Sequence, residues 1–294
     1  MFFLKQGSGA GEKLGMYFTT VGIAFLSLVI GQLFTEIFAV KTLGYSLTKI
    51  PESADLNLTL SLLLIPFSFV LTGILLSVKF IHKRPVLSVF TSRKSFDWKR
   101  FGFSFLVWGV VMFAFMIVSM NTGAPIEWNL NFTTFIPLLF ISLFLIPIQT
   151  TAEELLFRGY LFQGFGFFFK KGWIAILLTG TLFGLLHLAN PEVAKLGNIL
   201  LLFYIGTGVF MAIISHMDDG IELSMGYHTI NNIFASLILT NDWQAFQTEA
   251  MYIDHSEPML GAESFLTILV LQPLLILLFS KVYRWKHWKE KFLE

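Results

Sequence analysis

The stretch TFIPLLFISLFLIPIQTTAEELLFRGYLFQGFGFFF, residues 134–169, decides the class of this protein. Apolar side chains fill almost all of it, and its only charged residues are Glu153, Glu154 and Arg158. About 20 predominantly apolar residues are enough for a helix to cross the hydrocarbon core of a bilayer. The stretch is longer than one straight crossing requires. We therefore expect a membrane-spanning helix that bends or continues along the interface.

The composition of the whole chain agrees with this interpretation. Of 294 residues, 55% are hydrophobic, 13% are charged and 34 are Phe. A soluble domain usually carries about 25% charged residues, so much of the normal solubilising charge is absent. We predict an all-α, polytopic transmembrane helical bundle that forms one membrane domain over residues 1–294, with a catalytic core at about residues 134–240.

Net charge and cysteine content exclude several kinds of partner. A net charge of +1 gives no reason to expect nucleic acid as a partner. The absence of Cys removes disulfides, thiolate nucleophiles and thiolate metal sites. The partner that the composition implies is the lipid bilayer, and no oligomeric state is indicated.

Segments of spanning length recur along the chain. The pattern predicts eight spans, with the fourth long and the seventh the least apolar. They are Tyr17–Val40, Leu58–Ile81, Phe101–Met120, Thr134–Phe169, Trp173–Asn190, Gly197–His216, Leu223–Leu239 and Glu263–Tyr283.

The positions of Lys and Arg predict the orientation of the spans. With the N-terminus inside, 16 of the 20 basic residues fall on the inner side, and only Lys41, Lys49 and Lys195 fall in outer loops. Positively charged loops stay cytoplasmic. We therefore expect a multi-pass protein of the cell membrane with both termini in the cytoplasm.

Ionisable groups within spans are costly and mark functional sites by default. In the fourth span, Glu154 and Arg158 are four residues apart, so they share one helix face and can pair. Glu153 lies about 100° around the helix from Glu154 and lacks this partner. An unpaired carboxylate in a low-dielectric site suits proton transfer. The spacing thus gives Glu154 a structural role and Glu153 a chemical role, unless both acids clamp Arg158 for folding.

Two further spans carry histidine and amide groups. His187 lies among apolar residues in the fifth span and could hold a water molecule together with Glu153. In the seventh span, His228 and Asn232 share one face and offer two donors, the pair needed where an oxyanion develops in peptide hydrolysis. Asn231 points away by about 100°, which is typical of a packing or capping residue. A polar contact between helices is the alternative for each group.

The depths of the two histidines do not match in straight, upright helices. His187 lies roughly 20 Å from the cytoplasmic end of its span and His228 about 10 Å from that side, at 1.5 Å per residue. A shared site therefore requires tilted helices or a broken fourth helix. Gly180 and Gly184 are spaced to allow close helix packing near His187.

The ordered motifs E-E-x-x-x-R, F-x-x-x-H and H-x-x-x-N, on three separate spans, resemble the CPBP family of type II CAAX prenyl endopeptidases and bacteriocin-processing or immunity proteins. The resemblance covers roughly Thr150 to Ser236. It implies an intramembrane endopeptidase that acts on a membrane-associated protein or peptide without a cofactor. The roles implied are activation of water by Glu153 and His187, oxyanion stabilisation by His228 and Asn232, and support of the helix by Glu154 and Arg158.

Three other functions remain open on the sequence. Glu153, His187 and His228 could hold zinc, because two His and one carboxylate form a known catalytic set, so zinc is not excluded as a cofactor. The same residues could relay protons in a transporter, but no inverted repeat is present. The pocket could also serve only for binding, in a non-catalytic immunity or scaffold protein.

Overall fold

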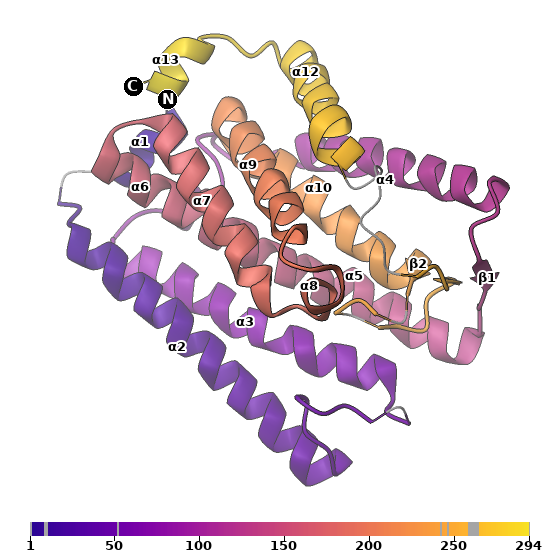
Figure 1. Ribbon diagram of the computed structural model, residues 1–294. Helices are drawn as coiled ribbons and strands as arrows, with labels where there is room; N and C mark the ends of the chain where they lie inside the picture. Colours follow the sequence, from indigo (N-terminus) through magenta and orange to yellow (C-terminus); the bar gives the residue numbers. More distant parts are fainter. Residues whose placement is uncertain are drawn as a thin grey trace.

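The computed structural model describes residues 2–8, 11–51, 53–241, 243–245, 247–257 and 265–293, and helices make up nearly all of its regular structure (Figure 1). The α-helices are α1 (Phe2–Lys5), α2 (Leu14–Phe38), α3 (Leu56–Phe80), α4 (Trp98–Asn121), α5 (Phe132–Glu154), α6 (Phe162–Phe169), α7 (Gly172–Leu186), α8 (Pro191–Leu196), α9 (Leu200–Asp218), α10 (Glu222–Ile233), α12 (Gln272–Val282) and α13 (Trp288–Leu293). π-helical segments cover Ala39–Leu43, Leu155–Leu161, Phe234–Ile238 and Thr267–Leu271, and 3-10 turns cover Gln6–Ser8, Val86–Val89 and His187–Ala189. The predicted all-α bundle is confirmed.

Six helices in the described ranges are long and apolar enough to cross a membrane, so the chain is a multi-pass membrane protein. They are Leu14–Leu43, Leu56–Phe80, Trp98–Asn121, Phe132–Phe169, Gly172–Ala189 and Leu200–Asp218, which match the first six predicted spans.

The last two predicted spans are shorter in the structure. The seventh corresponds to α10 and the π-helical segment after it, and the eighth to the apolar helix Thr267–Val282. Glu263, where we expected the eighth span to begin, lies outside the described residues. The total of eight spans therefore stays a prediction.

Helix α10 lies inside the bundle, in contact with α4, α5 and α9 (Figure 1). Every residue from Glu222 to Ile230 is buried, including Ser224, His228 and Thr229. Polar side chains on this helix therefore meet protein rather than lipid, which explains why the segment is the least apolar of the predicted spans.

Glycines bring α7 and α9 into backbone contact. A Cβ atom on Gly208 would lie 2.6 Å from the carbonyl oxygen of Gly180, and one on Gly184 would lie 2.7 Å from the backbone nitrogen of Ile205. Small residues of this kind allow membrane helices to approach closely. The predicted close packing at Gly180 and Gly184 is confirmed, and it fixes the end of α7 that carries His187.

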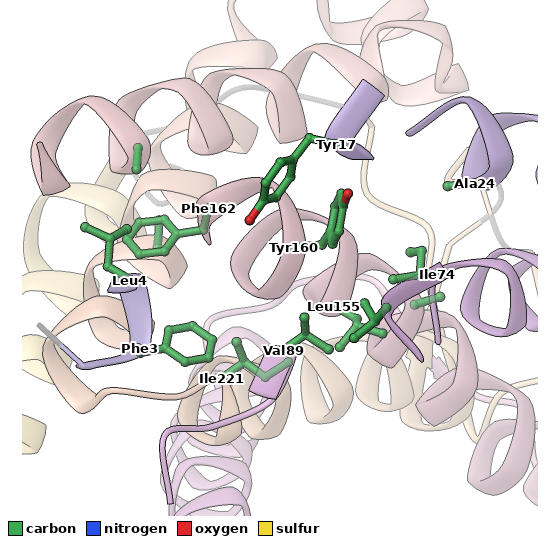
Figure 2. Close-up of a cluster of buried hydrophobic side chains, with 14 of the residues drawn as sticks. Phe3, Leu4, Tyr17, Ala24, Ile74, Val89, Leu155, Tyr160, Phe162 and Ile221 are labelled. Carbon is green, nitrogen blue, oxygen red and sulfur yellow. The ribbon is translucent and has the colours of Figure 1, made fainter. Parts of the chain in front are cut away.

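A buried cluster connects the start of the chain to the fourth span, the long helix Phe132–Phe169, which we call the fourth helix and which is distinct from α4 (Figure 2). Phe3 and Leu4 of α1 are buried with Phe162 of α6, and the ring of Tyr17 on α2 lies 5.2 Å from the ring of Tyr160. Within a membrane, the packing of such large side chains stabilises the contact between helices through van der Waals contacts. The N-terminal segment is thus packed onto the helix that also carries the glutamate pair.

Arg93, in the loop before α4, and Arg100, in the first turn of α4, hold the turn between α9 and α10. Arg93 lies 3.0 Å from the carboxylate of Asp218 and 3.2 Å from that of Glu222, and Arg100 also pairs with Asp218. Both acids are buried. These arginines, which we expected to act only as an orientation signal, therefore neutralise the acids that begin and precede α10.

A three-stranded sheet fixes the other end of α10. Its strands are β1 (Ile126–Trp128), β2 (Leu239–Thr240) and β3 (Tyr252–Asp254), in the order β1-β3-β2. Strand β1 is antiparallel and β2 parallel to β3. Because β2 follows the Phe234–Ile238 segment directly, the sheet holds the chain where α10 ends.

Candidate active site

The Glu154–Arg158 pair lies at the junction of α5 and the π-helical segment Leu155–Leu161. Arg158 Nη1 donates to Glu154 Oε1 at 2.8 Å, and both side chains are fully buried. Arg158 also donates to the carbonyl of Gly208 at 3.2 Å, and its guanidinium lies 4.1 Å from the ring centre of Phe183. The pairing agrees with the helical spacing, and it joins the fourth helix to α7 and α9.

Glu154 has a second partner that the sequence did not indicate. His228 Nδ1 lies 2.9 Å from Glu154 Oε1, the same oxygen that Arg158 contacts. A carboxylate accepts hydrogen bonds, so Nδ1 carries the hydrogen and a neutral His228 presents a lone pair at Nε2. The role of His228 as an oxyanion donor stays a prediction. His228 can donate from Nε2 only as an imidazolium.

Glu153 faces a different environment from its neighbour. Its side chain is 17% exposed, whereas that of Glu154 is fully buried. Glu153 Oε2 lies 3.7 Å from His228 Nε2, and Glu153 Oε1 accepts a hydrogen bond from Gln149 Nε2. As expected, the two acids point into different environments, and Glu153 does not pair with Arg158. We expected Glu153 to have no partner, but it accepts a hydrogen bond. Its hydrogen-bond donor is a neutral amide one helical turn earlier.

Asn232 joins this group from α10. Its Nδ2 donates to Gln149 Oε1 at 3.0 Å and lies 3.5 Å from His228 Nε2. Asn231 accepts a hydrogen bond from Trp108 Nε1 at 3.2 Å, and its Nδ2 donates to Asn232 Oδ1 at 3.3 Å. Glu153, His228 and Asn232 are thus brought together across the contact between α5 and α10.

His187 ends α7 and is held by its own helix and by α9. Its Nδ1 donates to the carbonyl of Phe183 at 2.8 Å, so Nε2 of the neutral ring is free to accept a proton. The ring stacks on Tyr204 at 4.3 Å between centres. The ring of Phe183 lies close to both imidazoles, with its centre 4.7 Å from that of His187 and 5.8 Å from that of His228. Phe183 is thus a shared neighbour of His187 and His228.

Two features of the helices depart from the straight geometry behind the mismatch in depth. Helix α7 packs closely on α9, and the fourth span changes to a π-helix directly after Glu154. π-helical segments occur frequently at functional sites. That His187 shares one site with His228 stays a prediction.

Two residues of this region were missed by the sequence reasoning. Gln149 had a detectable signal, because it lies four residues before Glu153 and therefore on the same face. Tyr204 had none, since only the packing of α9 on α7 places it on His187.

No group of three His, Cys, Asp or Glu side chains is arranged to hold one metal ion within the described ranges. His187 is not grouped with Glu153 and His228 in that way. The zinc-dependent alternative stays a prediction.

A family model and one curated relative match this chain. Residues 132–234, which run from α5 to the end of α10 and contain all six predicted site residues, match the type II CAAX prenyl endopeptidase Rce1-like family. The uncharacterized protein YyaK of Bacillus subtilis (strain 168) is 33% identical over 229 residues, covering 76% of this chain and 74% of the relative. No solved structure matches the chain. The chain therefore belongs to the Rce1-like, or CPBP, family of membrane proteases.

Proposed function

We propose that the protein is an intramembrane endopeptidase in which Glu153 is the general base for peptide-bond hydrolysis. The observation that carries the proposal is the meeting of Glu153, His228 Nε2 and Asn232 Nδ2 within 3.7 Å across α5 and α10. A partly exposed carboxylate beside two nitrogen groups can bind water and take its proton. Membership of a protease family supports peptide hydrolysis over ion transport.

The proposed reaction uses each group according to its hydrogen bonds. Glu153, with His187 Nε2 nearby, removes a proton from water as the water oxygen attacks the carbonyl carbon. Asn232 Nδ2 and protonated His228 Nε2 stabilise the oxyanion. The C–N bond then breaks, and the proton taken from water passes to the leaving nitrogen. Glu154 keeps Nδ1 of His228 protonated and its ring oriented, while Arg158 neutralises Glu154.

The proposed substrate is a membrane-associated protein or peptide in the cell membrane, with both termini of the enzyme in the cytoplasm. The family description names prenylated CAAX proteins, so a prenylated C-terminus is one substrate to test first. A non-catalytic immunity protein that uses the same pocket only for binding is the alternative function.

Comparative membrane proteomics of cells that carry the wild type or Glu153→Ala tests this proposal. We expect peptide ends that the wild type generates to disappear in the variant, because loss of a general base costs about 10²- to 10⁴-fold in rate. Glu127→Ala is the matched control, because Glu127 on β1 is largely exposed and pairs with His255, which is not one of the proposed site residues.

The outcomes separate the two functions. Peptide ends that persist in Glu153→Ala at wild-type levels would refute the protease mechanism. If that variant also protected cells from a toxin or bacteriocin as the wild type does, the immunity function would replace it.

A further inference from the structure

Five side chains form a directional chain of hydrogen bonds that ends at Glu153. Trp108 Nε1 donates to Asn231 Oδ1 at 3.2 Å, and Asn231 Nδ2 donates to Asn232 Oδ1 at 3.3 Å. Asn232 Nδ2 then donates to Gln149 Oε1 at 3.0 Å, and Gln149 Nε2 donates to Glu153 Oε1. The chain runs from α4 through α10 to α5.

The two ends of the chain fix its direction. An indole N–H can only donate, and an ionised carboxylate can only accept. Each of the three amides between them has one donor end and one acceptor end. All three must therefore point the same way, with NH₂ toward Glu153, because a reversed amide would place two acceptors or two donors face to face. Such chains polarise each bond and strengthen the next.

We infer that Gln149 is a positioning residue for hydrolysis, and that the chain from Trp108 through Gln149 sets the orientation of both the base and the oxyanion donor. This inference rests on the proposed function. Gln149 is only 4% exposed and contacts groups on both sides of the site. It holds one oxygen of Glu153, which leaves Oε2 on the side of His228 for water.

The same chain prepares Asn232 for its role. The NH₂ group of Asn232 has two hydrogens, and one of them is donated in the hydrogen bond to Gln149 Oε1. The second hydrogen lies on the side of His228 Nε2, where the proposed oxyanion forms. Without the chain, the amide could rotate and present its oxygen to that position, which would repel the oxyanion instead of stabilising it.

Gln149→Met tests the inference, because Met has a similar length but neither donates nor accepts strongly. The probe is a quenched fluorescent peptide that spans the bond identified by the proteomic comparison. We expect kcat to fall about 10²-fold, as for a misplaced reacting group, with KM little changed. Trp108→Phe keeps an aromatic ring in place but removes the first donor, and we expect a fall in kcat of about 2- to 10-fold.

Thr150→Val is the matched control. Thr150 and Thr229 are joined at 2.9 Å, so this bond also links α5 to α10, but it touches no proposed reacting group. We expect its kcat to stay within about twofold of the wild type, the effect of less than one ordinary hydrogen bond.

Three results would overturn the inference. The first is a wild-type kcat in Gln149→Met. The second is an equal loss of kcat in Gln149→Met and in Thr150→Val. The third applies if Gln149→Met does not fold, and it is a wild-type kcat in Trp108→Phe. If Glu153→Ala is inactive in the same assay, the proposed function stands in each case. Cleavage by Glu153→Ala would instead show that the proposed function itself is wrong.

Discussion

One oxygen of Glu154 receives both Arg158 and His228, which combines the charge balance of the buried site with the orientation of a proposed catalytic ring. Removing one partner of a fully buried ion pair leaves the other charge uncompensated. The two roles of Glu154 therefore cannot be separated by a single substitution, but their sizes can be measured.

We expect Glu154→Gln to lower the free energy of unfolding by about 3–5 kcal/mol, because it leaves Arg158 buried without a counter-charge. It should also lower activity in the fraction that folds, since His228 loses its carboxylate partner. Thermal unfolding in detergent and peptide cleavage measure the two effects.

Glu153→Gln is the control for this substitution. Its carboxylate is partly exposed and accepts from a neutral amide, so we expect the variant to fold with nearly wild-type stability and to lack activity. A Glu154→Gln variant as stable as Glu153→Gln would contradict the structural role of the Glu154–Arg158 pair.

At the level of helices, the contact between α7 and α9 sets the place of His187. Gly208→Ala would put a methyl group 2.6 Å from the carbonyl oxygen of Gly180, so the helices must separate. We expect a loss of about 1–3 kcal/mol in the free energy of unfolding, the usual cost of overpacking. Thermal unfolding in detergent is the measurement.

Gly22→Ala provides the comparison, because a Cβ at Gly22 on α2 meets no atom within 4 Å. Alanine also favours a helix by about 1 kcal/mol over glycine, so this variant should be as stable as the wild type or more so. Equal destabilisation of both variants would show that the crossing of α7 and α9 is not tightly packed.

The residue pairs that the sequence predicted correctly lie on one helix. The contact of Glu154 with Arg158 and the shared face of His228 and Asn232 follow from 3.6 residues per turn. The partners of His228 and of His187 lie on other helices, so they depend on tilt, on glycine contacts and on the π-helical segment. The tilt and the π-helical segment cannot be calculated from a periodic pattern, and only the packing of α9 on α7 places Tyr204 on His187.

The N-terminal segment is tied to the fourth helix by a second polar group, outside the proposed site. His82, just beyond α3, lies 2.6 Å from Glu12 and 2.7 Å from the hydroxyl of Tyr160, and Arg84 lies 3.1 Å from Glu12. Burial lowers the pKa of His82 below its ordinary value of 6.5, although the Glu12 carboxylate acts in the opposite direction. Arg84, which pairs with Glu12, also acts to lower the pKa of His82.

This lowered pKa predicts a loss of stability in acid. Between pH 6.5 and the lower pKa of the folded state, the unfolded chain binds a proton that the folded chain does not, so stability is full above pH 6.5 and falls below it. We expect the unfolding temperature of the wild type to fall more steeply than that of His82→Gln when the pH is lowered from about 7 to about 5. His255→Gln, at an exposed histidine, is the control and should keep the wild-type slope.

If the unfolding temperature of His82→Gln depended on pH as steeply as that of the wild type, His82 would not be the group responsible for the loss of stability in acid.

On the scale of the whole molecule, the family match covers α5 to α10, whereas α2 and α3 at one side and α12 at the other lie outside it (Figure 1). All six predicted site residues lie within the match, whereas Trp108 on α4 lies outside it. Most of the basic residues also lie outside the match, and the predicted orientation rests on them.

The proposed orientation can be tested with single cysteines, since the chain has none of its own. Lys289→Cys and Glu257→Cys lie at exposed positions near the C-terminus and in the loop after β3. We expect a membrane-impermeant maleimide to label Glu257→Cys in intact cells and Lys289→Cys only after lysis. Labelling of both from one side would refute either the orientation or the even number of spans.

The π-helical segment Leu155–Leu161 makes the length of the fourth helix hard to change. One residue added to this segment would turn the helix beyond it by about 100° relative to α5. Arg158 is held by Glu154 on one side, while Tyr160 is held by His82 on the other. An insertion here must therefore break one of these contacts, so we expect the segment to tolerate added residues poorly during evolution or engineering.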